Sequence, residues 1–197
     1  GPSEYEKIVD YICRVVEGKK GNYMVFCPSY QYLHAIEDIL AAREASGALS
    51  FIWNAQTNHM TEEDREAFLQ SFEEERDCSM AALSVMGGIF SEGIDLKEER
   101  LIGAVIIGTG LPQVNTEQEI LKEYFDEQGE HGFDYAYQYP GMNKVMQAAG
   151  RVIRTIRDRG IIALLDDRFL RPEYVALFPR EWGTYTVVNR YNVDQAV

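Results

Sequence analysis

Short apolar segments alternate with amphipathic ones along most of this chain, and that alternation limits the folds open to it more than any other feature. A helical period of apolar residues predicts helices at 4–17, 31–45, 61–75, 116–128 and around 147–154. Apolar runs bounded by Gly, Pro or polar residues predict strands at 23–27, 49–53, 80–85, 101–108 and 161–165. The rhythm favours an α/β fold: a doubly wound, mainly parallel sheet with helices on both faces.

Several finer expectations follow from the same pattern. The near-continuous apolar run at 101–108 is typical of a strand covered on both faces and predicts the centre of the sheet. Ser3 and Glu6 have the spacing of a capping box, and Thr61 is the expected N-cap of the third helix. Residues 129–140, with four aromatic side chains, are expected to be irregular. Residues 171–197 form a C-terminal extension that carries no motif.

The charge of the chain opposes one class of function, the binding of nucleic acid. The formal net charge is −13, whereas proteins that hold DNA non-specifically are usually basic over the contact face. The acidic residues gather, however, in runs at 62–64, 73–75 and 117–130, which are typical of solvated helix faces. Residues 151–159 instead hold four arginines against Asp158 alone. The sign of the local charge therefore differs from that of the whole chain.

The remaining bulk features suggest a single domain without a membrane segment. A length of 197 residues favours one domain. Gly1-Pro2-Ser3 is typical of the remnant of a cleaved tag on a piece of a larger protein, so the domain is expected at 4–197. No apolar run is long enough to span a bilayer, which predicts a cytoplasmic protein. The three cysteines and three histidines lie far apart, so we expect free thiols and no metal site.

The segment Gln147–Arg154 separates polar side chains from apolar ones. At helical spacing Gln147, Arg151 and Arg154 share one face, and the opposite face holds Val145, Ala149, Val152 and Ile156. Two planar guanidiniums at this spacing suit a polyphosphate or a carboxylate cluster, and Gly150 allows a ligand or another backbone to come close. The alternative is a pair of surface salt bridges with the many carboxylates.

Two further segments carry candidate polar residues after predicted strands. Val25–Tyr30 places Ser29 between a strand and a helix, where its hydroxyl can hold a phosphate or simply cap the helix. Gly87–Leu96 begins with two glycines, which fit a turn, and continues through Ser91, Glu92, Gly93 and Asp95. Taken alone, Asp95 is also explained as a cap or a salt-bridge partner.

In their order along the chain, Val25–Tyr30, Gly87–Leu96 and Gln147–Arg154 resemble motifs IV, V and VI of the superfamily-two DNA helicases of the XPD/DinG type. Asp158–Gly160 and Asp166–Phe169 are similar to the sequence that follows motif VI there, so the resemblance covers roughly residues 20–170. It implies that residues 4–197 are the second RecA-like motor domain of an ATP-dependent DNA helicase, a hydrolase with a role in DNA repair. Three ordered motifs are a far more specific signal than one.

The resemblance also implies roles for individual residues. Arg151 and Arg154 would act as arginine fingers at the γ-phosphate of ATP, with Gln147 as their polar partner. Gly93, Asp95 and Gly150 would face the nucleotide. Ser29, Tyr30, Ser91 and Glu92 would contact single-stranded DNA, along which the family moves 5′ to 3′. For the aromatic residues of 133–139 the alternatives are stacking on bases and, as the favoured interpretation, packing in the core or against a neighbouring domain.

The chain lacks the rest of an ATPase site. It has no G-x-x-x-x-G-K-[ST] loop and no acidic magnesium box. By the resemblance, ATP and Mg²⁺ are held mainly by a first RecA-like motor domain of the full-length chain, the half that in this family often carries an iron–sulfur cluster. We therefore expect the isolated segment to be inactive. The alternatives are a non-catalytic RecA-like interaction module that binds a protein through its acidic helices, and half of an RNA helicase.

Overall fold

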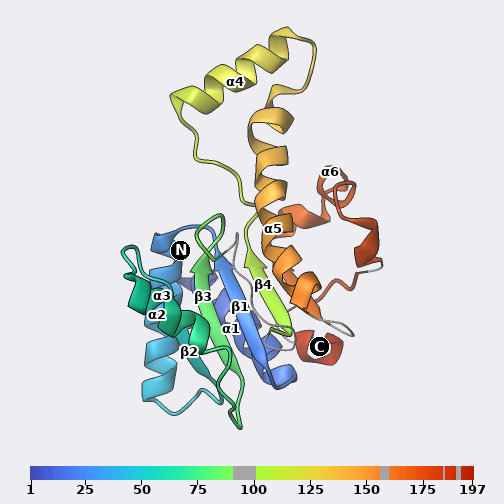
Figure 1. The fold of residues 1–197 in the computed structure, drawn as a ribbon. Coiled ribbons are helices and arrows are strands. Elements are labelled where there is room, and N and C mark those ends of the chain that lie inside the picture. The colour runs from blue at the N-terminus through green and yellow to red at the C-terminus, as the bar shows by residue number, and fades with distance from the viewer. Residues whose placement is uncertain (91–100, 156–159, 184, 190–191) are drawn as a thin grey trace.

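The computed structural model shows a five-stranded parallel sheet between two layers of helices (Figure 1). It describes residues 1–90, 101–155, 160–183, 185–189 and 192–197. The strands are β1 Asn22–Cys27, β2 Ile52–Ala55, β3 Met80–Val85, β4 Gly103–Ile107 and β5 Ile161–Leu165. The main helices are α1 Pro2–Gly18, α2 Tyr30–Ala45, α3 Glu62–Gln70, α4 Thr116–Glu127 and α5 Tyr139–Thr155. The predicted α/β fold is confirmed.

The strand order is β2-β3-β1-β4-β5, and every neighbouring pair is parallel. The central strand is therefore β1, and the prediction that residues 101–108 occupy the centre is wrong by one position. β4 is nevertheless paired on both sides, which explains its continuous burial. The chain leaves β1 toward one edge of the sheet and leaves β4 toward the other. In an open α/β sheet, ligands bind at such a switch point.

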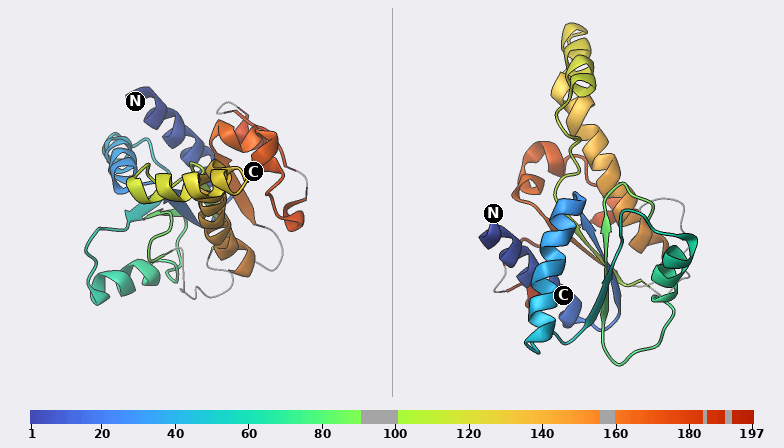
Figure 2. Two further views of the ribbon diagram at one scale, coloured as in Figure 1. Left: turned by 90° about the horizontal axis from the view of Figure 1, so that it is seen from above. Right: turned by 90° about the vertical axis from the view of Figure 1, so that its left-hand side faces the viewer.

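Alternate side chains of the central strand face two separate cores. Tyr23, Val25 and Cys27 of β1 pack against α1 and α2, whereas Met24 and Phe26 pack against α3 and α5. Figure 2 shows these two layers on opposite sides of the sheet. Burial of both faces explains why β1, β3 and β4 read as apolar runs in the sequence and not as alternating patterns.

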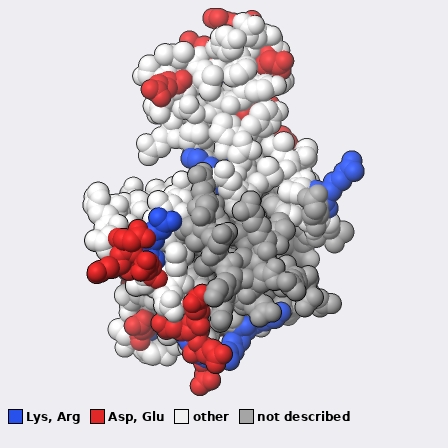
Figure 3. Space-filling view, in the orientation of Figure 1, with Lys and Arg blue, Asp and Glu red and all other residues white. Residues whose placement is uncertain are grey.

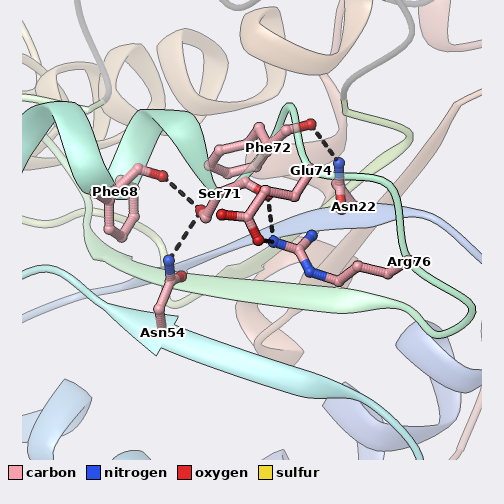
Figure 4. Close-up of polar contacts among 7 residues, drawn as sticks. All are labelled: Asn22, Asn54, Phe68, Ser71, Phe72, Glu74 and Arg76. Carbon is pink, nitrogen blue, oxygen red and sulfur yellow. Dashed lines mark hydrogen bonds and ion pairs between the residues drawn. The ribbon is translucent and has the colours of Figure 1, made fainter.

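The third helix ends earlier than its sequence predicts, at Gln70 instead of near Glu75. Figure 4 shows the reason: side chains at its end bond across to the sheet. Asn54 of β2 donates to the Ser71 hydroxyl at 2.9 Å, and Asn22 of β1 donates to the Phe72 carbonyl at 2.9 Å. Phe72 is completely buried beneath this network. These long-range bonds turn the chain away from the helix axis.

Of the two N-caps predicted for α3 and α1, one is confirmed and one is wrong. Thr61 caps α3, as predicted, and its hydroxyl accepts from the backbone N–H of Asp64 at 3.1 Å. The first helix already begins at Pro2, so the predicted cap at Ser3 is wrong. A proline in the first turn is compatible with a helix because its missing N–H would have had no partner there.

The stretch 129–140 is mostly helical, contrary to the prediction of an irregular loop. A π-helical segment, η1 Asp134–Gln138, continues directly into α5. Pro140 near this junction has no N–H to donate, and the backbone N–H of Tyr139 bonds to the Asp134 carbonyl in the wider π pattern. Together α4 and η1 project well beyond the sheet (Figures 1 and 2).

The C-terminal extension folds back onto the domain. It follows η2 Asp167–Leu170 and contains the short helices α6 Pro172–Val175, η3 Arg180–Trp182 and α7 Val193–Ala196. Phe178 and Trp182 pack on one core, and Val193 is buried in the other beside α1. Among the described residues, no helix is both long and apolar enough to cross a membrane.

Candidate functional site

The loops that follow the strands meet along one edge of the sheet, because all five strands are parallel. The backbone N–H of Met86, just after β3, donates to the Cys27 carbonyl at the end of β1, at 2.8 Å. On the other side, Gly108 donates to the Leu165 carbonyl of β5 at 3.3 Å. A Cβ atom placed on Gly108 would lie 3.6 Å from the Pro28 side chain. The structure thus brings together segments that lie far apart in the sequence, up to the 138 positions between Cys27 and Leu165.

Ser29 is the N-cap of α2. Its backbone is extended, and its side-chain oxygen accepts from the Tyr32 N–H at 3.2 Å. The capping alternative is therefore confirmed. The side chain is only partly buried, and a hydroxyl that accepts one bond still has its own proton to donate. A contact with a phosphate stays a prediction.

Tyr30 joins α2 to the loop after β2. Its hydroxyl donates to the Thr57 carbonyl at 3.3 Å, and its ring lies tilted against His34 with centroids 6.2 Å apart. Partial burial raises the pKa of the Tyr30 phenol above its ordinary value, so the hydroxyl stays protonated at neutral pH. The ring and hydroxyl lie at the same edge of the sheet as Ser29.

Gln56 organises the start of the glycine-containing loop, a role that the sequence did not indicate. The residue is 3% exposed, and its side-chain oxygen accepts from the Val85 N–H at 3.0 Å. A Cβ atom on Gly88 would lie 3.0 Å from the Val85 carbonyl and 3.4 Å from the Gln56 amide nitrogen. Gly88 is therefore needed for space, and Gly87 for its φ of +78°.

We expect Gln56→Leu to lower the free energy of unfolding by about 1–3 kcal/mol, because the N–H of the partly buried Val85 loses its acceptor and the Gln56 side chain is almost completely buried. Urea unfolding followed by far-UV circular dichroism measures the change. The control is Gln31→Leu at an exposed position of α2, which should stay within about 0.5 kcal/mol of the parent. Equal effects of the two substitutions would show that the Gln56 bridge contributes nothing specific.

Four of the predicted site residues belong to the loop after Phe90. Ser91, Glu92, Gly93 and Asp95 fall at 91–100, outside the described residues. The described part of their loop ends at Phe90, which is 1% exposed and stacks on Phe68 with centroids 4.2 Å apart. The contacts of these four residues with nucleotide or DNA remain predictions.

Helix α5 has the two faces that the sequence predicts, as far as its side chains are described. Val145 and Ala149 are buried against the sheet, and Gln147 is exposed. The helix runs on to Thr155, so positions 147, 151 and 154 share its outer face. The side chains of residues 151–159 lie outside the described part of the structure. The arginine-finger role of Arg151 and Arg154 and the alternative of surface salt bridges therefore both stay predictions.

Gly150 leaves open space on this helix. A Cβ atom built there meets nothing within 4 Å. Gly141, at the other end of the same helix, is the opposite case: its Cβ would lie 2.5 Å from the Thr109 carbonyl. A Cβ on Gly110 would likewise lie 2.6 Å from the Gly141 carbonyl. The close approach of Gly141 and Gly110 fixes α5 against the loop after β4.

Lys144 is a further cation at this edge that the sequence reading passed over. Its aliphatic stem lies beside Gly87, where a Cβ atom would be 3.4 Å from the lysine Cδ. Lys144 also lines a cavity of about 1300 Å³, to which α1, β5 and the C-terminal extension contribute most of the other lining residues. The available signal was its position one helical turn before Gln147.

The loop after β5 is held by an ion pair. Arg168 contacts Asp166 at 2.7 Å, and the Asp166 side chain also accepts from the Arg168 backbone N–H at 2.9 Å. Burial alone would raise the pKa of Asp166, but these hydrogen bonds from Arg168 outweigh it and lower the pKa. Asp166 is therefore a carboxylate at neutral pH. No group of three or more metal-ligating side chains gathers among the described residues.

Comparison with known proteins gives one consistent family. Residues 12–185 match the sequence profile of the helicase C-terminal domain. ATP-dependent DNA helicase CHL1 of Debaryomyces hansenii is 25% identical over 173 residues, which cover 80% of this chain and 21% of that protein. The XPD/RAD3 helicase subunit of the general transcription and DNA repair factor IIH of Saccharomyces cerevisiae is 30% identical over 166 residues, covering 78% and 21%.

Solved structures agree on the fold. An apo structure of XPD superposes with a TM-score of 0.70 at 20% identity, covering 89% of this chain and 34% of the other. A second XPD helicase structure gives a TM-score of 0.69 at the same identity. The chain spans 21% of the length of both yeast proteins. It therefore corresponds to one part of those helicases.

Proposed function

We propose that this chain, which belongs to the helicase C-terminal domain family, is the second RecA-like motor domain of an ATP-dependent DNA helicase of the XPD/DinG type, a proposal that the similarity to XPD supports. The first motor domain of the same full-length protein would be its direct partner, and single-stranded DNA its substrate. The observation that carries the proposal is the family match over 12–185, which contains the helix with Gln147, Arg151 and Arg154 on one face.

In this proposal α5 supplies the cationic side of an ATP site between two lobes. Arg151 and Arg154 stabilise charge on the γ-phosphate, and Gln147 orients them or the attacking water. The exposure of Gln147 and the open space at Gly150 support an outward-facing site. When bound, ATP supplies the phosphoryl group whose transfer drives the motor. Gly93 and Asp95 would face the same nucleotide.

Magnesium would be held by the first domain. The residues proposed to face ATP from this domain are mainly neutral or cationic. The function of this domain is then to complete the site when the two lobes close. Closure positions the guanidiniums, and opening after hydrolysis withdraws them.

The DNA track in this proposal lies at the carboxyl edge of the sheet. Ser29 and Tyr30 would contact phosphates and sugars, with Ser91 and Glu92 beside them. The partly buried Ser29 hydroxyl at the N-terminus of a 16-residue helix supports the assignment, because backbone N–H groups and the helix dipole favour an anion there. Alternate binding and release of the DNA by the two lobes would move the protein 5′ to 3′ along one strand. This activity would take place in the cytoplasm or in another compartment that contains its DNA.

A first test uses the isolated segment and the full-length protein side by side. We expect the purified segment to show no ATP hydrolysis above background, because it has no phosphate-binding loop. The full-length protein should hydrolyse ATP faster when single-stranded DNA is added. Turnover by the segment that survives Arg151→Ala would contradict the half-site assignment. Stimulation by RNA and not by DNA would favour an RNA helicase.

A further inference from the structure

A projecting arm, residues 112–140, carries a large share of the exposed apolar surface. It contains α4 and η1 and stands clear of the sheet in Figure 1 and in the right-hand view of Figure 2. No residue of α4 is buried. The arm includes seven of the twelve exposed large apolar residues of the described chain: Val114, Ile120, Leu121, Tyr124, Phe133, Tyr135 and Tyr139. Exposed apolar side chains that gather on one element mark a binding surface for another molecule or domain more often than they simply face water.

The arm is held in one shape by its own contacts. The Gln118 amide donates to the Ala136 carbonyl at 2.7 Å, and the Tyr137 hydroxyl donates to Glu119 at 3.0 Å. Phe125 stacks on Tyr135 with centroids 4.5 Å apart. At the base, the Gln138 amide donates to the Glu173 carbonyl of α6 at 3.0 Å. The exposed side chains are therefore presented on a preorganised scaffold, which reduces the entropy lost on docking.

The charge of the arm argues against nucleic acid as its partner. Between 112 and 140 there are seven acidic residues and one basic residue, Lys122. Figure 3 shows the carboxylates as separate patches on the arm, at the top of the view, with uncharged surface between them. The field is strong enough that Glu130, first among several causes, raises the pKa of the Tyr135 phenol. DNA phosphates, and the acidic arm of a second copy of this chain, would both be repelled.

From these observations we infer that the arm docks onto another domain of the same full-length polypeptide, through an apolar groove rimmed by Lys and Arg side chains. The inference rests on the proposed function. The relatives supply the room for such a domain, since this chain spans only 21% of the two yeast proteins. Charge complementarity supplies the specificity, and the exposed Ile120 and Tyr124 supply the apolar contact.

Docking of the arm would also control where the arginines lie. The segment η1 continues into α5, and α5 reaches Arg151 without a break. At about 1.5 Å per residue, Tyr139 and Arg151 are roughly 18 Å apart along one rigid helix. A domain that holds the arm therefore holds the arginine-bearing end of α5 in a defined orientation. The arm and α5 would thus form one continuous helical connection between that domain and the ATP site.

The test places a photo-crosslinking amino acid at position 120 of the full-length protein and, as a matched control, at position 187. Ile120 and Val187 are equally exposed, at 61% each, but Val187 lies outside the arm. We expect crosslinks from position 120 to peptides outside residues 1–197 of the same molecule. A domain of the same polypeptide is held near the arm at an effective concentration of about 1 mM, which does not depend on the concentration of the protein. The crosslinking yield should therefore not change when the protein is diluted about tenfold.

Two results would overturn the inference. A yield at position 120 no higher than at position 187 would mean that the arm is not covered. A yield that falls with dilution would identify a separate molecule as the partner. Single-stranded-DNA-stimulated ATP hydrolysis is measured on the same preparations. If hydrolysis is present and the crosslink is absent, the docking inference fails while the proposed function stands; if hydrolysis is absent, the proposed function fails.

Discussion

Arg151→Ala in the full-length protein is expected to lower the kcat of DNA-stimulated ATP hydrolysis by about 10³–10⁵-fold, the range measured where an arginine finger is removed. The guanidinium would stabilise charge that develops on the γ-phosphate only during transfer, so ATP binding should change far less than turnover. Steady-state phosphate release at saturating single-stranded DNA measures kcat, and equilibrium titration with a fluorescent ATP analogue measures binding.

Two further substitutions make this result specific. Arg151→Lys keeps the charge but loses the planar fork, so it should restore little of the lost rate. Arg180→Ala, at an exposed position of η3, removes a surface arginine and should leave kcat within about twofold of the parent, since surface changes have small effects. If Arg151→Ala leaves DNA-stimulated hydrolysis intact, the domain is an interaction module and not half of a motor.

Gly141→Ala is expected to lower the free energy of unfolding by about 1–3 kcal/mol, the usual cost of forcing extra atoms into a closed contact. The added Cβ would lie 2.5 Å from the Thr109 carbonyl and 3.1 Å from the backbone of Gly110 and Leu111. Backbone atoms cannot rotate away as a side chain can, so α5 would have to move relative to β4. Urea unfolding of the same segment measures the change.

The matched control lies nine residues, or about two and a half turns, further along the same helix. A Cβ on Gly150 meets nothing within 4 Å, so Gly150→Ala should stabilise the domain by up to about 1 kcal/mol through helix propensity alone. If a nucleotide or the first lobe comes close to Gly150, the same substitution should slow ATP hydrolysis in the full-length protein. Opposite signs of the two stability changes are required; a stabilising Gly141→Ala would show that the tight contact is not present.

The kinds of element were predictable from the sequence because they depend on local spacing. The strands Met80–Val85 and Ile161–Leu165 have the bounds that their apolar runs predict. Thr61 and Ser29 cap the helices that follow them, since a cap needs only a backbone N–H three residues ahead. The division of α5 into a buried and an exposed face is also local, and it is confirmed at Val145, Ala149 and Gln147.

Elements whose limits depend on distant partners were predicted less well. α3 ends early because Asn54 and Asn22 bond to the backbone and side chains at its end. The second strand lies at 52–55 instead of 49–53, where it pairs with β3 from Met80 onward. The stretch 129–140 looked like a loop because of its glycines and Pro140, yet η1 accommodates the proline by a wider hydrogen-bond pattern.

The sequence by itself determined the fold class, the order of the three motifs and the polar face of the helix that carries Gln147. Each of these follows from residue types at fixed spacing along the chain. Only the tertiary structure decided that β1 is the central strand, that Gln56 supports the loop after β3 and that Gly141 meets Gly110. The partners in these contacts lie at least 29 positions apart in the sequence. The contacts stabilise the protein only once the sheet has brought both partners together.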